Sequence, residues 1–114
     1  MTDYIKIRKA PGKWCVRSGG AILGETTNAL ELLEGDLAPV IYFPRADIAM
    51  AFLDKTDKLT HCPHKGDATH YSIVNKSSVT QNAVWSYEDP IPAVAQIKGY
   101  LAFYPLESVK VEQI

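Results

Sequence analysis

Residues 4–26 read YIKIRKAPGKWCVRSGGAILGET and contain three short segments separated by two turn signals. In the first segment, Ile5 and Ile7 alternate with polar or charged residues, which is the period of a half-buried strand. The chain then turns at Pro11-Gly12 and again at Ser18-Gly19-Gly20, because proline and glycine favour tight reversals. This pattern predicts antiparallel strands joined by short turns.

Strand-like segments continue along the chain. They are rich in β-branched and aromatic residues, are bounded by turn residues, and cover residues 40–43, 71–74, 79–87 and 100–104. Strands therefore dominate the predicted secondary structure. We expect one mainly β domain over residues 1–114, built from antiparallel sheets.

Helix is expected to be a minority. Residues 46–53 and 93–97 predict one or two short helices or helical turns, the second of them after Pro92. Residues 27–35 fit either a marginal helix, capped by Asn28 and ended by Gly35, or a strand that pairs back on residues 21–26. The sequence leaves these two alternatives open.

The composition is that of a neutral globular domain. The 114 residues include 46% hydrophobic and 22% charged residues, which excludes disordered, collagen-like and coiled-coil chains. A formal net charge of −1 provides no field for a polyanion, so no nucleic-acid partner is expected. No apolar stretch approaches the roughly 20 residues of a membrane span, so no membrane partner is expected. The first residues lack a secretory signal pattern, and we expect a cytoplasmic protein with reduced Cys15 and Cys62.

Metal-ligating residue types are concentrated in residues 60–70. The segment contains all three histidines, His61, His64 and His70, together with Cys62. Imidazole and thiolate are natural zinc ligands, so these four side chains are the candidates for a metal site. Their spacing matches no zinc pattern and no second cysteine pair lies nearby. Ordinary loop histidines are therefore the preferred interpretation, and no metal or other cofactor is expected.

Cys62 also permits a catalytic interpretation. Positive charge on His64 or Lys65 would favour a thiolate at Cys62, and either residue could act as its acid-base partner. The alternative is a small buried cysteine that closes the turn before Pro63. Sequence shows neither an oriented base nor an oxyanion site, so both interpretations stay open.

Two cations form the basis for an anion site. Arg45 and Lys65 could hold a small anion, with Gly66 letting the backbone approach it closely. The segment is not a phosphate loop, because the upstream glycine is missing and Asp67 follows Gly66. The plainer alternative is a surface ion pair between Arg45 and Asp47, with Lys65 solvated.

Aromatic residues gather in the later strands. Phe43 and Phe103 are expected in the core, where rings favour strand positions. Tyr42, Trp85 and Tyr87 carry polar tips that need a partner, and their rings could either fill the core or wall a pocket for a small organic ligand.

Two blocks of sequence carry a family resemblance. They are Tyr42-Phe43-Pro44-Arg45-Ala46-Asp47-Ile48 and Cys62-Pro63-His64-Lys65-Gly66, followed by Ala83-Val84-Trp85-Ser86-Tyr87 and Ala102-Phe103-Tyr104. The chain resembles domain-of-unknown-function family 427 over roughly residues 13–105. The family's characteristic positions map onto Tyr42, Arg45, Asp47, Cys62, Lys65, Gly66, Trp85, Tyr87 and Tyr104.

The resemblance implies a fold and a kind of site. It implies two antiparallel sheets packed at an angle, as in the β-tent group, whose cleft binds small ligands beside a zinc held by two Cys-x-x-Cys knuckles. Those knuckles are absent from this sequence. The family carries a nucleotidyltransferase-like label, but the chain shows no paired catalytic carboxylates in a Gly-Ser context, so the activity is not carried over.

We therefore expect a domain that binds a small anionic or aromatic ligand in a cleft between sheets. The expected ligand-binding residues are Tyr42, Arg45, Asp47, Cys62, Lys65, Gly66, Trp85 and Tyr87. One alternative is a small enzyme that uses Cys62 with His64 or Lys65. Another is a structural module that forms a homo-oligomer through an exposed strand edge.

Overall fold

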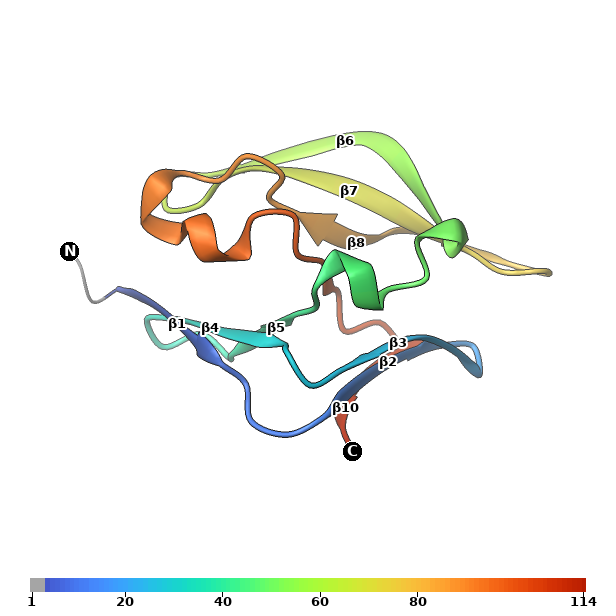
Figure 1. The fold of residues 1–114 in the computed structure, drawn as a ribbon. Helices are drawn as coiled ribbons and strands as arrows, with labels where there is room; N and C mark the ends of the chain where they lie inside the picture. The colour runs from blue at the N-terminus through green and yellow to red at the C-terminus, as the bar shows by residue number, and fades with distance from the viewer. Residues whose placement is uncertain (1–3) are drawn as a thin grey trace.

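The computed structural model describes residues 4–114 and consists mainly of strands (Figure 1). The strands are β1 (Ile5–Lys9), β2 (Trp14–Ser18), β3 (Ala21–Thr26), β4 (Leu30–Glu34), β5 (Val40–Tyr42), β6 (Leu53–Cys62), β7 (Gly66–Val74), β8 (Val79–Ser86), β9 (Ala102–Phe103) and β10 (Val109–Gln113). Three short 3₁₀ helices interrupt them, η1 (Arg45–Asp47), η2 (Met50–Phe52) and η3 (Pro92–Ile97). The prediction of a mainly β fold with short helical turns is confirmed.

The strands form three antiparallel sheets rather than the expected two. Their strand orders are β1-β4-β5, β10-β2-β3 and β6-β7-β8-β9. In Figure 1 the four-stranded sheet lies above the other two, which sit side by side beneath it. The lower layer is divided because β4 and β3 do not pair with each other. Core side chains from all three sheets therefore pack between the two layers.

Within residues 27–35 the chain forms a strand, Leu30–Glu34, and not a helix. Strand β4 pairs with β1 on one side and with β5 on the other, so the expected pairing with residues 21–26 is wrong. Gly35, with a φ of +53°, ends β4 in a left-handed conformation, and its amide donates to the carbonyl of Tyr4 at 2.9 Å. Partners on both edges supply the backbone hydrogen bonds that a seven-residue helix would have lacked.

Two strands were not anticipated. Strand β6 carries polar or charged residues along most of its length and is almost entirely exposed, and β10 follows a turn near the end of the chain. Strand β6 lacks a clear apolar alternation, which removes the main sequence signal, whereas β10 does alternate Val109 and Val111 with Lys110 and Glu112 but is short. Among residues 4–114, no helix has the length and apolar character needed to cross a membrane.

The core has two parts that meet under the four-stranded sheet. One part joins that sheet to β2 and β3 and includes Phe43 and Phe103, whose rings meet edge to face at 5.8 Å. The other part joins it to β4, β5 and η3. Phe43 connects the two layers further, because its backbone exchanges hydrogen bonds with Leu101 at 2.8 and 2.9 Å.

Candidate functional site

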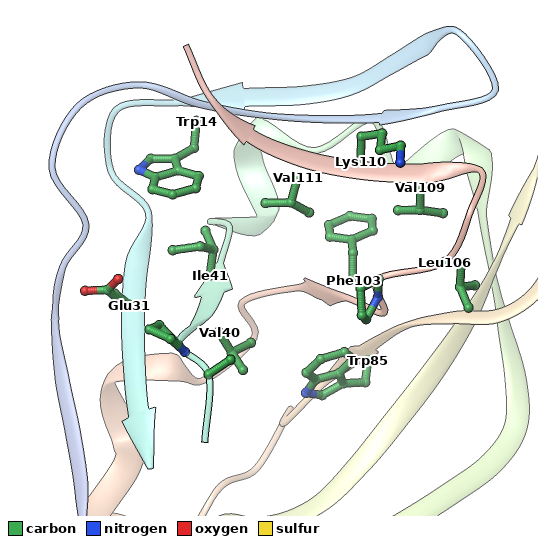
Figure 2. Close-up of a pocket in the computed structure, with 13 residues that line it drawn as sticks. Trp14, Glu31, Val40, Ile41, Trp85, Phe103, Leu106, Val109, Lys110 and Val111 are labelled. Atoms are coloured by element: carbon green, nitrogen blue, oxygen red, sulfur yellow. The ribbon is translucent and has the colours of Figure 1, made fainter. Parts of the chain in front are cut away.

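A cavity of about 660 Å³ lies where the three sheets meet. Apolar side chains from β2, β5, β8, β9 and β10 form most of its wall (Figure 2). We call this the inter-sheet cavity; it is lined by Trp14, Glu31, Ala38, Pro39, Val40, Ile41, Trp85, Phe103, Pro105, Leu106, Val109, Lys110 and Val111. Its size is in the range of cavities that accept small organic molecules.

Both tryptophans of the chain line the inter-sheet cavity. Figure 2 shows Trp14 at one end and Trp85 at the other, with Ile41 and Phe103 between them. The Trp14 Nε1 donates to the Pro11 carbonyl at 2.9 Å, and the Trp85 Nε1 donates to the Tyr42 hydroxyl at 3.2 Å. Because each indole N–H already has an acceptor, the rings offer apolar surface to the cavity.

The two charged residues at the wall face elsewhere. Glu31 pairs with Arg8 at 2.7 Å, and Figure 2 shows its carboxylate turned away from the other labelled side chains. Strand alternation puts Val109 and Val111 toward Phe103 and leaves Lys110 on the exposed side of β10. The side chains that point into the inter-sheet cavity are therefore apolar or aromatic.

Trp85 is the one predicted ligand-binding residue that lines this cavity. Tyr42 lies directly behind it, fully buried, with its ring edge-on to the indole at 6.2 Å. On another side, the Tyr104 ring packs against Trp85 at 4.4 Å. Burial raises the pKa of the Tyr42 hydroxyl strongly, so this hydroxyl stays protonated as a neutral partner of Trp85.

Arg45 belongs to a polar network whose residues do not line the inter-sheet cavity. Its guanidinium donates to the Gly99 carbonyl at 3.1 Å, to the Ser86 hydroxyl at 3.3 Å and to the Glu88 carboxylate at 3.0 Å. The Tyr71 hydroxyl donates to the same carboxylate. Burial by itself would raise the Glu88 pKa, but the Tyr71 hydrogen bond and nearby cations hold it below its usual value.

Asp47 does not pair with Arg45. Instead, it accepts a hydrogen bond from the Thr26 hydroxyl at 2.8 Å and so ties η1 to the end of β3. The expected ion pair between Arg45 and Asp47 is therefore replaced by the pair between Arg45 and Glu88.

Lys65 is buried and not solvated. Its ammonium donates to the Glu34 carboxylate, and the two side chains are 10% and 14% exposed. The ammonium also lies 6.0 Å from the centre of the Tyr87 ring. This pair connects the β6–β7 hairpin to the end of β4, so Arg45 and Lys65 each have their own carboxylate.

Within the described chain, the β6–β7 turn gives Cys62 no imidazole partner, and the nearby Lys65 ammonium is bonded to Glu34. Cys62 is half-buried and packs beside the core, and no imidazole within residues 4–114 forms a hydrogen bond with its sulfur. The His64 ring packs on Tyr4 at 4.8 Å. Gly66 has a φ of +111°, a left-handed conformation that lets the chain turn tightly next to the backbone of residues 89–91.

The three histidines lie in three different surroundings. His61 pairs with Asp67 at 2.7 Å on the exposed hairpin, whereas His70 is fully buried with its Nε2 3.0 Å from the Tyr104 hydroxyl. In the part of the chain that the structure describes, no three His, Cys, Asp or Glu side chains are grouped so as to hold a metal ion.

Residues 6–114 match the model of the family described as domain of unknown function (DUF427). The chain belongs to the DUF427 family. The match covers nearly the whole chain and confirms the resemblance inferred from the two sequence blocks. No curated protein matches this DUF427 chain in sequence.

Most of the inter-sheet cavity in this DUF427 chain was missed by sequence reasoning. In the sequence Trp14 indicates only a strand position, and Val40, Val111 and Phe103 carry no chemical signal beyond apolarity. The one available clue was the alternation of Trp14 and Val16 on β2, which marks an inward face. What that face contacts depends on long-range packing.

Proposed function

We propose that this DUF427 protein binds a planar, mainly apolar small molecule in the inter-sheet cavity. The observation that carries the proposal is the cavity of about 660 Å³ with an indole at each end. Concave, largely apolar cavities with aromatic walls are the usual sites for small organic ligands. A planar ring system would find two indoles and the Phe103 ring as stacking or edge partners.

The charge distribution favours a neutral or weakly polar ligand over an anion. Arg45 and Lys65 do not line the cavity, and each is already paired with a glutamate. An anion would have to displace one of these carboxylates, and for Lys65 the displaced carboxylate would be in a largely buried position. The expected anionic ligand is thus less well supported than the aromatic one.

The cavity wall is supported on both sides, which favours a preformed site. Trp85 is held by Tyr42 at its N–H and by Tyr104 at its ring, and Phe103 is packed against the buried Phe43. A wall that does not reorganise lowers the entropic cost of binding. In this proposal Trp85 contacts the ligand, and Tyr42 is a positioning residue.

The remaining predicted residues take supporting roles in the proposal. Cys62, Lys65, Gly66 and Tyr87 build the β6–β7 end of the fold, and Asp47 ties η1 to β3. None of these five residues lines the inter-sheet cavity.

A fluorescence titration with N-phenylnaphthylamine, a neutral planar probe, tests the proposal. Because both tryptophans line the cavity, energy transfer from indole to the bound probe reports occupancy. The variant Val40→Phe places a ring into the cavity and should weaken binding at least tenfold, which corresponds to about 1.4 kcal/mol. The matched control Ile22→Phe adds the same ring at an exposed position of β3 outside the cavity and should leave binding unchanged.

Two results would overturn the proposal. One is equal affinity of Val40→Phe and the unmodified protein for the probe. The other is an equal loss in Ile22→Phe, which would indicate nonspecific adsorption. A parallel titration with the anionic anilinonaphthalene sulfonate should give no tighter binding, because no cationic side chain points into the cavity.

A further inference from the structure

Two β-bulges face each other across the central strand β7. On β6, residues 56–58 lie opposite the single residue His70, between the pairs that flank it. On β8, residues 81–83 lie opposite the single residue Ser72 in the same way. Bulges bend a strand and redirect its side chains, and they are frequent beside functional sites. Here both flanking strands bulge at neighbouring positions on the same face of β7.

The two bulges are bonded to each other. The Thr56 hydroxyl donates to the Asn82 side-chain oxygen at 2.6 Å, although β6 and β8 are not neighbours in the sheet. The backbone N–H of Asn82 donates to the Ser72 hydroxyl at 3.1 Å. Asn82 has a φ of +51°, the one positive value found at a residue other than glycine within residues 4–114. Such a conformation is kept only where the surroundings fix it, and it clusters at ligand sites.

Two open hollows, each combining polar and apolar surface, adjoin this Thr56–Asn82 link. They have volumes of about 440 and 480 Å³, and both are lined by Gln81 and Asn82. Asp54 and Thr56 contribute to one hollow, and Lys58 and Tyr104 contribute to the other. Within the described part of the chain, the Gln81 amide and the charges of Asp54 and Lys58 have no side-chain partner. We call these two hollows the bulge groove.

A buried histidine lies behind the second hollow. His70 is fully buried, its Nε2 is 3.0 Å from the Tyr104 hydroxyl, and its Nδ1 has no hydrogen-bond partner among residues 4–114. Burial and, to a smaller extent, the Lys58 charge lower the His70 pKa, so the imidazole is neutral at physiological pH. The Tyr104 hydroxyl at the wall of the hollow is therefore hydrogen-bonded to a neutral imidazole.

We propose that the bulge groove is a binding site for a polyhydroxylated ligand, a carbohydrate. Sugar hydroxyls both donate and accept hydrogen bonds. The groove offers side-chain amides and hydroxyls, which can donate and accept in turn, and a carboxylate, which can accept. Two hollows in series, bridged by Asn82, fit two linked sugar units better than one. Apolar surface from Pro105 and Leu106 is available to the C–H face of a sugar ring. The bulge groove adjoins the inter-sheet cavity, with which it shares Pro105 and Leu106, but Gln81, Asn82 and Lys58 lie outside the lining of that cavity.

Side-chain amide signals in a nitrogen–proton correlation spectrum test the inference. Cellobiose, a neutral disaccharide, and digalacturonate, its acidic counterpart in the test, are each titrated to tens of millimolar. The amide signals of Gln81 and Asn82 should shift in a saturable way, while that of the exposed Gln96 on η3 should not move. Stronger shifts with digalacturonate would indicate that Lys58 binds a carboxylate of the sugar. Stronger shifts with cellobiose would indicate that the groove recognises a neutral sugar through its hydroxyl groups.

Two variants separate binding from folding. Asn82→Gly removes the amide but keeps a residue that accepts a positive φ, so the bulge should be retained. Gln81→Ala removes an exposed side chain. Each should weaken sugar binding at least fivefold, and Gln96→Ala should have no effect. The inference is wrong if neither sugar shifts the Gln81 and Asn82 signals, or if both variants bind as the unmodified protein does.

Discussion

The buried pair between Lys65 and Glu34 allows a direct test of whether a predicted ligand-binding cation is structural. Replacing Glu34→Gln keeps the shape of the side chain and removes its charge, leaving the Lys65 ammonium about 10% exposed without a carboxylate. Breaking a buried ion pair from one side usually costs about 3–5 kcal/mol. Since neither side chain is completely buried, we expect a loss of about 2–3 kcal/mol in the free energy of unfolding.

Urea unfolding followed by tryptophan fluorescence measures this loss. With a typical urea dependence for a domain of this size, the midpoint should fall by roughly 1–2 M. The double variant Glu34→Gln/Lys65→Met removes both charges and replaces the lysine stem by an apolar chain of similar length. It should recover about half of the loss or more, because no uncompensated charge remains.

The pH dependence gives the sign of the interaction. Burial by itself lowers the Lys65 pKa, but the hydrogen bond to Glu34 and the nearby Tyr87 and Cys62 raise it, so that the pKa lies above the ordinary lysine value. A raised lysine pKa contributes stability that is fully present below the ordinary value of about 10.4 and is lost as the pH rises through the folded-state pKa. The reasoning is refuted if Glu34→Gln costs less than about 0.5 kcal/mol at neutral pH, a value typical of exposed pairs.

Three further predictions follow from other contacts. Glu88→Gln should lower the free energy of unfolding in urea by about 1 kcal/mol at pH 7, a small value because the carboxylate is partly exposed to solvent. The folded-state pKa of Glu88 is low because a tyrosine hydroxyl and nearby cations outweigh the effect of burial. The difference in unfolding free energy between Glu88→Gln and the unmodified protein should therefore vanish as the pH falls through that pKa, and a difference that stays constant with pH would contradict this. Gly24→Ala should lower the unfolding free energy by about 1–3 kcal/mol in the same assay, because a Cβ would lie 2.3 Å from the Asp47 carbonyl oxygen; an unchanged value would refute the close approach. Iodoacetamide should modify half-buried Cys62 at least tenfold faster than Cys15, whose pKa is raised by burial and neighbouring glutamates, and equal rates by mass spectrometry would contradict the placement of both thiols.

The strands that sequence predicts correctly are those with local signals. Residues 4–26 combine alternation with proline and glycine turns, and β1, β2 and β3 form there. Strand β6 escapes prediction because polar and charged side chains fill an exposed edge, and β4 is ambiguous because its partners β1 and β5 lie outside the local window. The division of the lower layer into two sheets depends on those same distant pairings.

The candidate site shows the same limit more strongly. Residue chemistry correctly selects Trp85 as needing a partner for its N–H, and that partner is Tyr42. It fails for Arg45 and Lys65, because Glu88 and Glu34 are distant in sequence and carry no motif. Trp14 meets the same cavity as Trp85 only through the packing of separate sheets. Local pattern identifies side chains that need partners, whereas tertiary packing decides which partners they have.

The central claim is that the inter-sheet cavity between the tryptophans holds a planar apolar ligand. Isotope-filtered nuclear Overhauser spectroscopy of the protein with N-phenylnaphthylamine tests this claim most directly. The proposal predicts contacts from the probe to the indole protons of Trp14 and Trp85 and to the methyl groups of Ile41 and Val111. Contacts only to exposed methyl groups outside the cavity, such as those of Ile22, would contradict it.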